Sequence, residues 1–207
     1  MPQPSFPASN PAAEEADAAW VQVALAVTPE YLREFLLDVE RLLRINPCLE
    51  FESLTRAADG RYLLAGHNES NAQAFALTAS LSTRPADGGL VLRYAEGIKR
   101  ETRFEIAAAP SGSTLRIVDT YDAAASGAAQ GGSPTPDRSL VPWATALRAH
   151  LRRRLRWGAV PGYAWLVDRL WLRMPPRQRR LSWLILWTSA LEFVAFVAIL
   201  AIWLTAA

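Results

Sequence analysis

The stretch Trp20–Tyr31, WVQVALAVTPEY, predicts a strand that runs directly into a helix. Thr28 is a favourable N-cap, Pro29 suits the first helical position, and Glu30 complements the positive end of the helix dipole. Upstream of these residues, every second side chain is a large aliphatic one, which is typical of a strand with one buried face. The alternating positions are Val21, Val23, Leu25 and Val27.

The helix that starts at Pro29 is predicted to continue to Ile45, because apolar residues recur at helical spacing over this range. Asn46-Pro47 then ends it, since the residue before a proline disfavours the helical conformation. The apolar positions are Tyr31, Leu32, Phe35, Leu36, Val39, Leu42 and Leu43.

Between Cys48 and Tyr121 the period of the pattern changes to that of strands. Turn signals at Asp59-Gly60, Pro85–Gly89 and Pro110–Ser113 separate short alternating runs. Short strands with short connections pair in an antiparallel manner. The expected strands after the first are 49–54, 61–64, 75–81, 90–94, 102–106 and 115–121, with Leu63 expected to face the interior.

A loop rich in Ala, Gly, Ser and Pro is expected at 123–136, and a long helix from about Asp137 to Trp157. One side of this helix is apolar and the other carries arginines, so it can cover the apolar face of the sheet. The predicted fold class is therefore α+β. We expect four segments: a disordered N-terminus (1–18), a globular domain (19–157), an amphipathic linker (158–176) and a C-terminal anchor (177–207).

The last 27 residues, Leu181–Ala207, contain one ionisable side chain, Glu192. As a helix they would be about 40 Å long, compared with about 30 Å for the hydrocarbon core of a bilayer. The alternative, a buried helix of a soluble core, requires far more surrounding protein than 207 residues provide. Arginines precede the span and none follows it, which predicts a single-pass protein of the inner (cell) membrane with a cytoplasmic N-terminal domain. Met1–Asn10 has no basic cluster or apolar run, so we expect no secretory signal.

Charge is distributed unevenly although the net charge is only +2. Residues 1–136 carry 17 acidic and 11 basic side chains, a net of −6, whereas 137–180 carry 11 arginines and two aspartates, a net of +9. A basic segment beside an anchor is attracted to anionic lipid. Nucleic-acid binding is the alternative reading of these arginines, but no nucleic-acid-binding motif accompanies them, so we expect no nucleic-acid partner.

The order of these elements resembles the START-like (SRPBCC, polyketide cyclase/dehydrase-like) superfamily with its helix-grip fold. The resemblance covers Trp20–Trp157. It rests on the strand that enters Thr28-Pro29-Glu30-Tyr31, the helix exit Arg44-Ile45-Asn46-Pro47, the run of strands and the helix from Asp137. It implies a curved antiparallel sheet of about seven strands around a long C-terminal helix, with a cavity for an apolar molecule between them. It implies no catalytic signature, and we expect no cofactor.

The candidate cavity residues are the apolar side chains expected between sheet and helix. The simpler interpretation of each is a core residue without a function. Trp143 and Tyr94 are favoured as ligand contacts, because each has a polar atom that can orient a bound molecule. The candidates are Phe35, Val39, Phe75, Leu77, Leu92, Tyr94, Phe104, Ile117, Trp143 and Leu147.

Catalytic and metal motifs are missing from the sequence. His67 and His150 are far from each other and from Cys48, the only cysteine, so no metal-site spacing exists. The charged cluster between Glu96 and Arg103 is interpreted as a solvated sheet edge, with catalysis as the alternative. We therefore predict no catalytic residue and no metal.

Tryptophans lie on both sides of the expected membrane boundary and arginines lie just before it, as is typical of the interface. Tyr163–Met174 is expected to lie on the cytoplasmic leaflet or, alternatively, to pack on the globular domain. Glu192, in mid-span, is either a neutral, tolerated carboxylic acid or a contact with another membrane helix. The interface candidates are Trp157, Trp165, Trp171, Arg173, Arg177, Arg179 and Arg180.

The function predicted from the sequence is membrane-tethered binding or transfer of a hydrophobic ligand: a lipid, sterol, quinone or polyketide-like molecule. The expected partners are membrane lipid, that ligand and a second transmembrane helix at Glu192. Two alternatives stay open, a non-catalytic accessory subunit of a membrane complex and a cyclase- or dehydratase-like enzyme. The enzyme would need polar groups such as His67, Tyr94 or Glu96 to converge inside the cavity.

Overall fold

The computed structural model describes residues 18–83, 89–97, 99–121 and 138–206. Three sequence predictions fall wholly or mainly outside this range. These are the disordered segment 1–18, of which only Ala18 is described, the turn at Pro85–Gly89, of which only Gly89 is described, and the loop at 123–136.

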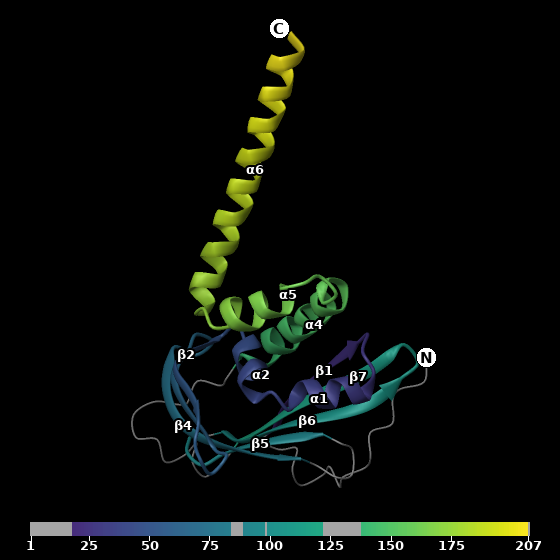
Figure 1. Ribbon diagram of the computed structural model, residues 1–207. Coiled ribbons are helices and arrows are strands. Elements are labelled where there is room, and N and C mark those ends of the chain that lie inside the picture. Colours follow the sequence, from purple (N-terminus) through teal and green to yellow (C-terminus); the bar gives the residue numbers. More distant parts are fainter. Residues whose placement is uncertain (1–17, 84–88, 98, 122–137, 207) are drawn as a thin grey trace.

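Seven strands form one antiparallel sheet in the order β1-β7-β6-β5-β4-β3-β2. Figure 1 shows that this sheet is strongly curved and that the helices of the domain lie on its concave side. The predicted α+β class and strand number are thus confirmed. The strands are β1 (Ala18–Leu25), β2 (Leu49–Arg56), β3 (Tyr62–Asn68), β4 (Gln73–Thr83), β5 (Leu90–Tyr94), β6 (Lys99–Ala109) and β7 (Gly112–Tyr121).

The strand-to-helix transition forms as predicted, but the helix is divided. Thr28 caps α1 (Pro29–Leu36), with its hydroxyl oxygen accepting from the Tyr31 N–H at 3.3 Å. The chain then breaks, and α2 (Val39–Ile45) begins with a cap of its own, the Asp38 carboxylate, which accepts from the Arg41 N–H at 3.1 Å. A second cap lets the apolar side of the segment follow the curved sheet, which one straight helix cannot do.

The long helix α4 (Leu140–Trp157) packs chiefly against β1 and α2. It covers the core at the β1 end of the sheet. Trp143, in the first turn of α4, is 2% exposed. Its indole N–H donates to the Leu42 carbonyl at 3.0 Å, and its ring meets Phe104 edge to face at 5.4 Å. The polar atom of Trp143 is therefore used to join α4 to α2.

The alternation of buried and exposed residues along β3 is shifted by one residue relative to the prediction. Tyr62, Leu64 and Asn68 are buried, whereas Leu63 is 47% exposed. Successive side chains on a strand point to opposite faces, so an error of one residue in phase moves Leu63 to the outside. A bulge between Phe51 and Ser53 changes the register of the neighbouring strand β2, and the sequence pattern gave no sign of it.

The expected amphipathic helix is a short turn, α5 (Tyr163–Trp165), followed by a π-helix, η2 (Leu166–Trp171). It packs on the domain: Leu172 is buried and Val167 contacts the core. Asp168 accepts from the Arg154 guanidinium at 3.1 Å and lies 3.7 Å from that of Arg41. Tyr163–Met174 thus contacts the domain, while its side chains Trp165, Leu166 and Leu170 remain exposed.

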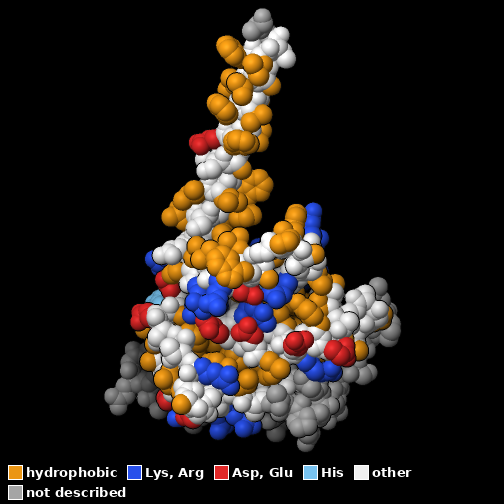
Figure 2. All heavy atoms as spheres, viewed as in Figure 1, with side chains coloured by type: hydrophobic (Ala, Val, Ile, Leu, Met, Phe, Trp, Pro, Cys, Tyr) orange, Lys and Arg blue, Asp and Glu red, His pale blue; other side chains and the backbone are white. Residues whose placement is uncertain are grey.

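The last helix, α6 (Pro176–Ala206), has 31 residues and projects away from the domain, as Figure 1 shows. Among the described helices it alone has the length and apolar composition to cross a membrane, over Pro176–Thr205. Figure 2 shows hydrophobic side chains along its whole visible length, interrupted by one acidic group. Near its start, Trp183 stacks edge to face on Trp171 of η2 at 6.2 Å and on Trp187 at 5.9 Å.

Candidate ligand-binding cavity

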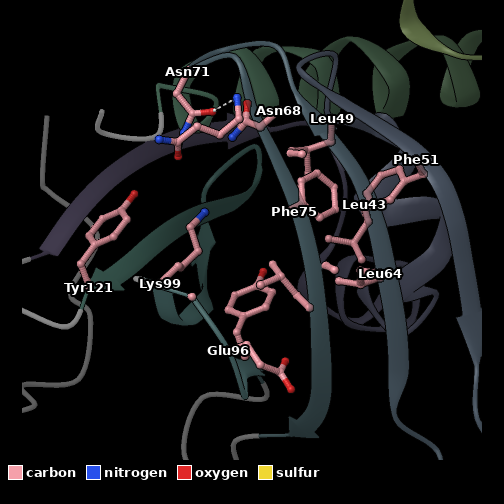
Figure 3. A pocket seen from close by; sticks show the side chains of 16 residues that line it. Leu43, Leu49, Phe51, Leu64, Asn68, Asn71, Phe75, Glu96, Lys99 and Tyr121 are labelled. Atoms are coloured by element: carbon pink, nitrogen blue, oxygen red, sulfur yellow. Dashed lines mark hydrogen bonds between the residues drawn. The ribbon is translucent and has the colours of Figure 1, made fainter. Parts of the chain in front are cut away.

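A cavity of about 470 Å³ lies on the concave side of the sheet, at the end that α4 does not cover. It is bounded by β2, β3 and β4, by Leu43 of α2, and by the facing ends of β5, β6 and β7. Figure 3 shows apolar side chains grouped on one side and Lys99 and Tyr121 on the other, with Asn71 and Glu96 toward opposite ends. The cavity thus has apolar and polar regions in one continuous wall.

The apolar region is built by strand alternation. Phe75 and Leu77 of β4 point into the cavity, and the next inward residue, Ala79, is fully buried in the core. Phe51 of β2 meets Phe75 edge to face, with ring centroids 5.8 Å apart. This region is formed by Leu43, Leu49, Phe51, Leu64, Phe75 and Leu77.

The polar region is backed by a connected chain of hydrogen bonds. The Lys99 ammonium donates to one oxygen of Asp119 at 2.7 Å, and the Thr102 hydroxyl donates to the other at 2.6 Å. The Tyr94 and Thr102 hydroxyls are 3.2 Å apart. Asp119 and Thr102 are 0% exposed, so Lys99 and Tyr94 present this buried network to the cavity.

One end of the cavity is closed by the turn between β5 and β6. Glu96 accepts from the Thr78 N–H at 2.6 Å, which fixes the turn on β4. Gly97 adopts a φ of +94°, and an added Cβ there would lie 3.2 Å from Leu77. Glycine therefore allows this close approach of the turn to the apolar region.

The other end is formed by the turn between β3 and β4. The Asn68 side chain accepts from the Ser70 N–H at 2.9 Å, and the Asn71 amide donates to Gln73 at 3.2 Å. The turn is tied to two other parts of the fold. Glu69 N–H donates to the Cys48 carbonyl at 2.7 Å, and the Ser70 hydroxyl accepts from the Arg138 N–H at 3.2 Å.

Comparison with solved structures identifies the architecture. The aromatase/cyclase Zhui from Streptomyces sp. R1128 superposes with a TM-score of 0.50 at 18% identity, over 69% of this chain and 97% of the other. The chain has the START-like helix-grip fold. A STAR-related lipid transfer protein from Xanthomonas axonopodis gives a TM-score of 0.44 at 13% identity, covering 65% of this chain and 85% of that one. No family model and no curated protein matches the sequence.

The helix-grip domain brings three of the ten candidate residues, Phe75, Leu77 and Tyr94, to the cavity. The other seven are at most 3% exposed and form the core under α1, α2 and α4. They are Phe35, Val39, Leu92, Phe104, Ile117, Trp143 and Leu147.

Several lining residues were not among the candidates. Lys99 and Glu96 belong to a cluster interpreted as a solvated edge, but they line the cavity, as does Tyr121. Asn68 and Asn71 carry ordinary turn signals. The sequence around these five residues looks like that of surface residues. Only the curvature of the sheet turns their side chains toward the cavity.

The two histidines lie outside the cavity wall. His67 is on the opposite face of β3 from Leu64 and Asn68. His150 is 6% exposed beside the Phe35 ring, and burial lowers its pKa from 6.5 to about 4. Within the described residues, no group of three or more His, Cys, Asp or Glu side chains is placed to hold a metal ion.

The residues predicted at the membrane interface are spread from the last residue of α4 to the first turns of α6. Trp157 and Trp165 are exposed at 46% and 61%, and Arg173 is exposed as well. Trp171 joins the stack with Trp183. Arg177, Arg179 and Arg180 lie in the first turns of α6, and Glu192 is exposed farther along the same helix.

Proposed function

We propose that this protein binds a hydrophobic small molecule in the helix-grip cavity while α6 holds the domain at the cytoplasmic face of the cell membrane. The ligand classes that fit are a lipid, a sterol, a quinone or a polyketide-like molecule. The observation that carries the proposal is the cavity itself, with six apolar side chains on one side and a few polar groups on the other. Ligand sites in proteins have this composition and occupy about 300–1,000 Å³.

The membrane placement is supported by α6 and its flanking charges. Its apolar side chains between Leu181 and Leu204 are exposed to the surroundings of the domain. A helix of this kind buries them in lipid. Basic side chains precede it, which favours a cytoplasmic domain.

The mechanism is partition between bilayer and cavity. Moving a lipid chain into water costs about 0.8 kcal/mol per methylene, and an apolar cavity removes most of this cost. The anchor keeps the cavity within reach of the bilayer, which raises the effective concentration of any membrane-dissolved ligand. Contacts of η2 with the domain and with Trp183 hold the cavity close to the start of the anchor.

Mass spectrometry of apolar molecules retained by the full-length, detergent-extracted protein tests this function. Leu77→Trp fills the apolar region and is expected to abolish retention. Leu63→Trp adds the same volume on the neighbouring strand but on the outer face, so it is expected to leave retention unchanged. Equal retention by both variants and the wild type would show that the cavity is not the binding site.

A cyclase- or dehydratase-like activity is the second candidate, favoured by the groups that line the polar region. Tyr94 and Glu96 reach the cavity together with Lys99, although His67 does not. The solved structure with the same fold, Zhui, is described as an aromatase/cyclase. The same mass measurement separates a carrier from a dehydratase: a carrier releases its ligand unchanged, whereas a dehydratase releases it with the loss of one water.

A further inference from the structure

The start of the anchor is joined to the rim of the cavity by one carboxylate. Glu69, in the turn between β3 and β4, accepts from Arg177 at 3.2 Å and from Arg180 at 3.1 Å. The side chain of Glu69 is only 17% exposed, whereas those of Arg177 and Arg180 are 76% and 66% exposed. The two guanidinium groups therefore cover the carboxylate from the solvent side.

Positive charge at this place exceeds the negative charge available to neutralise it. The Arg179 Nε is buried and makes no hydrogen bond within the described residues. The charges of Arg44 and Arg180 act on Arg179, and Arg44 is already paired with Glu40 at 3.0 Å. Four arginines thus share two carboxylates, which leaves an excess of two positive charges.

This cluster stands where lipid headgroups would be. Three of its arginines, Arg177, Arg179 and Arg180, occupy the first turns of α6, directly before the exposed apolar run that begins at Leu181. A phosphate group offers several charged acceptor oxygens and binds guanidinium groups in a bidentate manner, so it can engage two or three of these arginines at once.

We propose that Arg177, Arg179 and Arg180 form a binding site for the phosphate of an anionic phospholipid, which displaces Glu69 as the partner of Arg177 and Arg180. The inference rests on the membrane placement of α6 proposed above. It does not depend on what occupies the cavity.

Displacement has a consequence for the cavity rim. The turn from Glu69 to Ala72 links Asn68 and Gln73, which both line the cavity. Once the two arginines bind phosphate, this turn loses its ion pairs with α6 and keeps its ties to Cys48 and Arg138. Anionic lipid therefore loosens one end of the cavity at the surface from which a ligand would enter.

The test uses the full-length protein in nanodiscs of phosphatidylcholine, alone or mixed with phosphatidylglycerol of the same chains. Native mass spectrometry measures which lipid stays bound, and hydrogen exchange measures the protection of residues 68–73. We expect phosphatidylglycerol to be retained preferentially and exchange at 68–73 to rise in its presence. Arg179→Gln and Arg180→Gln are each expected to weaken its retention about tenfold, and Glu69→Gln to strengthen it.

The matched control is Arg173→Gln, which removes an exposed charge from the same part of the chain without touching Glu69. It should reduce retention about twofold or less. An equal loss in Arg173→Gln and Arg180→Gln would indicate diffuse attraction and overturn the site. Inorganic phosphate that displaces phosphatidylglycerol at equal concentration would also overturn it, by showing a site for the free ion.

Two further outcomes separate this inference from the proposed function. Release of the protein from vesicles by carbonate would refute the anchor, and the site with it. Firm insertion with equal retention of both lipids would refute the site alone.

Discussion

The Lys99 ammonium lies 2.7 Å from an Asp119 carboxylate oxygen, with the aspartate side chain fully buried and the lysine side chain 18% exposed. This pair joins β6 to β7 behind the polar region of the cavity. Removing one partner of a buried ion pair is strongly destabilising. The pair therefore supports both the fold and the polarity of the cavity wall.

Lys99→Met is expected to destabilise the protein by about 3 kcal/mol, because it leaves the buried Asp119 carboxyl group without its ammonium partner. The double variant Lys99→Met/Asp119→Asn should recover most of that loss, since Thr102 still hydrogen-bonds the amide. Urea unfolding of both variants measures the coupling. Additive losses in the double variant would contradict it.

His150 is expected to make stability dependent on pH between about 6.5 and 4. Burial is the main cause of its low pKa, partly opposed by Asp168 and assisted by Arg153, Arg154 and Arg41. The unfolded chain binds a proton near pH 6.5, but the folded chain does so only near pH 4. Stability is therefore complete above pH 6.5 and falls as the pH drops, by about 3 kcal/mol at most.

The check on this is thermal unfolding of His150→Gln across the same pH range, in which the dependence should flatten. His67→Gln removes the other histidine of the chain and should keep the wild-type dependence. A wild-type profile in His150→Gln would assign the effect to other groups.

Asp168→Asn is expected to release η2 from the domain. It removes the charge that pairs with Arg154 and Arg41, while Leu172 and the rest of the core stay in place. Hydrogen exchange should therefore rise over 163–172 and remain unchanged in the sheet. Arg169→Gln, at an exposed position of η2, is the control and should leave exchange as in the wild type.

Glu192→Leu is expected to remove a contact between α6 and another membrane helix, either a second copy or a partner subunit. A carboxyl group in mid-span costs about 3 kcal/mol unless it finds a polar partner. Cross-linking in native membranes measures the association, and Thr188→Val is a conservative control one turn away. The accessory-subunit alternative predicts a hetero-complex that only Glu192→Leu disrupts, and an unchanged cross-linking pattern would leave Glu192 as a neutral, tolerated acid.

The strands, the turns and the first helix cap could be predicted from the sequence alone. The alternation before Thr28, the cap at Thr28 and the turn signals between strands depend on neighbours in sequence, so all seven strands were located. The break at Asp38 and the outward position of Leu63 were missed: Asp38 caps a second helix, and the regular alternation of β3 has the opposite phase at Leu63 to the one expected.

The sequence by itself determined which residues avoid water: the inward faces of the strands, the apolar sides of the helices and the apolar anchor. Tertiary structure decided which of these faces stay uncovered. Because α4 packs over β1 and leaves the side of β2, β3 and β4 open, Phe104 and Trp143 became core while Phe75 and Leu77 became cavity wall. The spacing of apolar residues along the sequence predicts that a side chain points inward. The position of the covering helix, however, depends on contacts between residues about a hundred positions apart, such as Trp143 and Leu42.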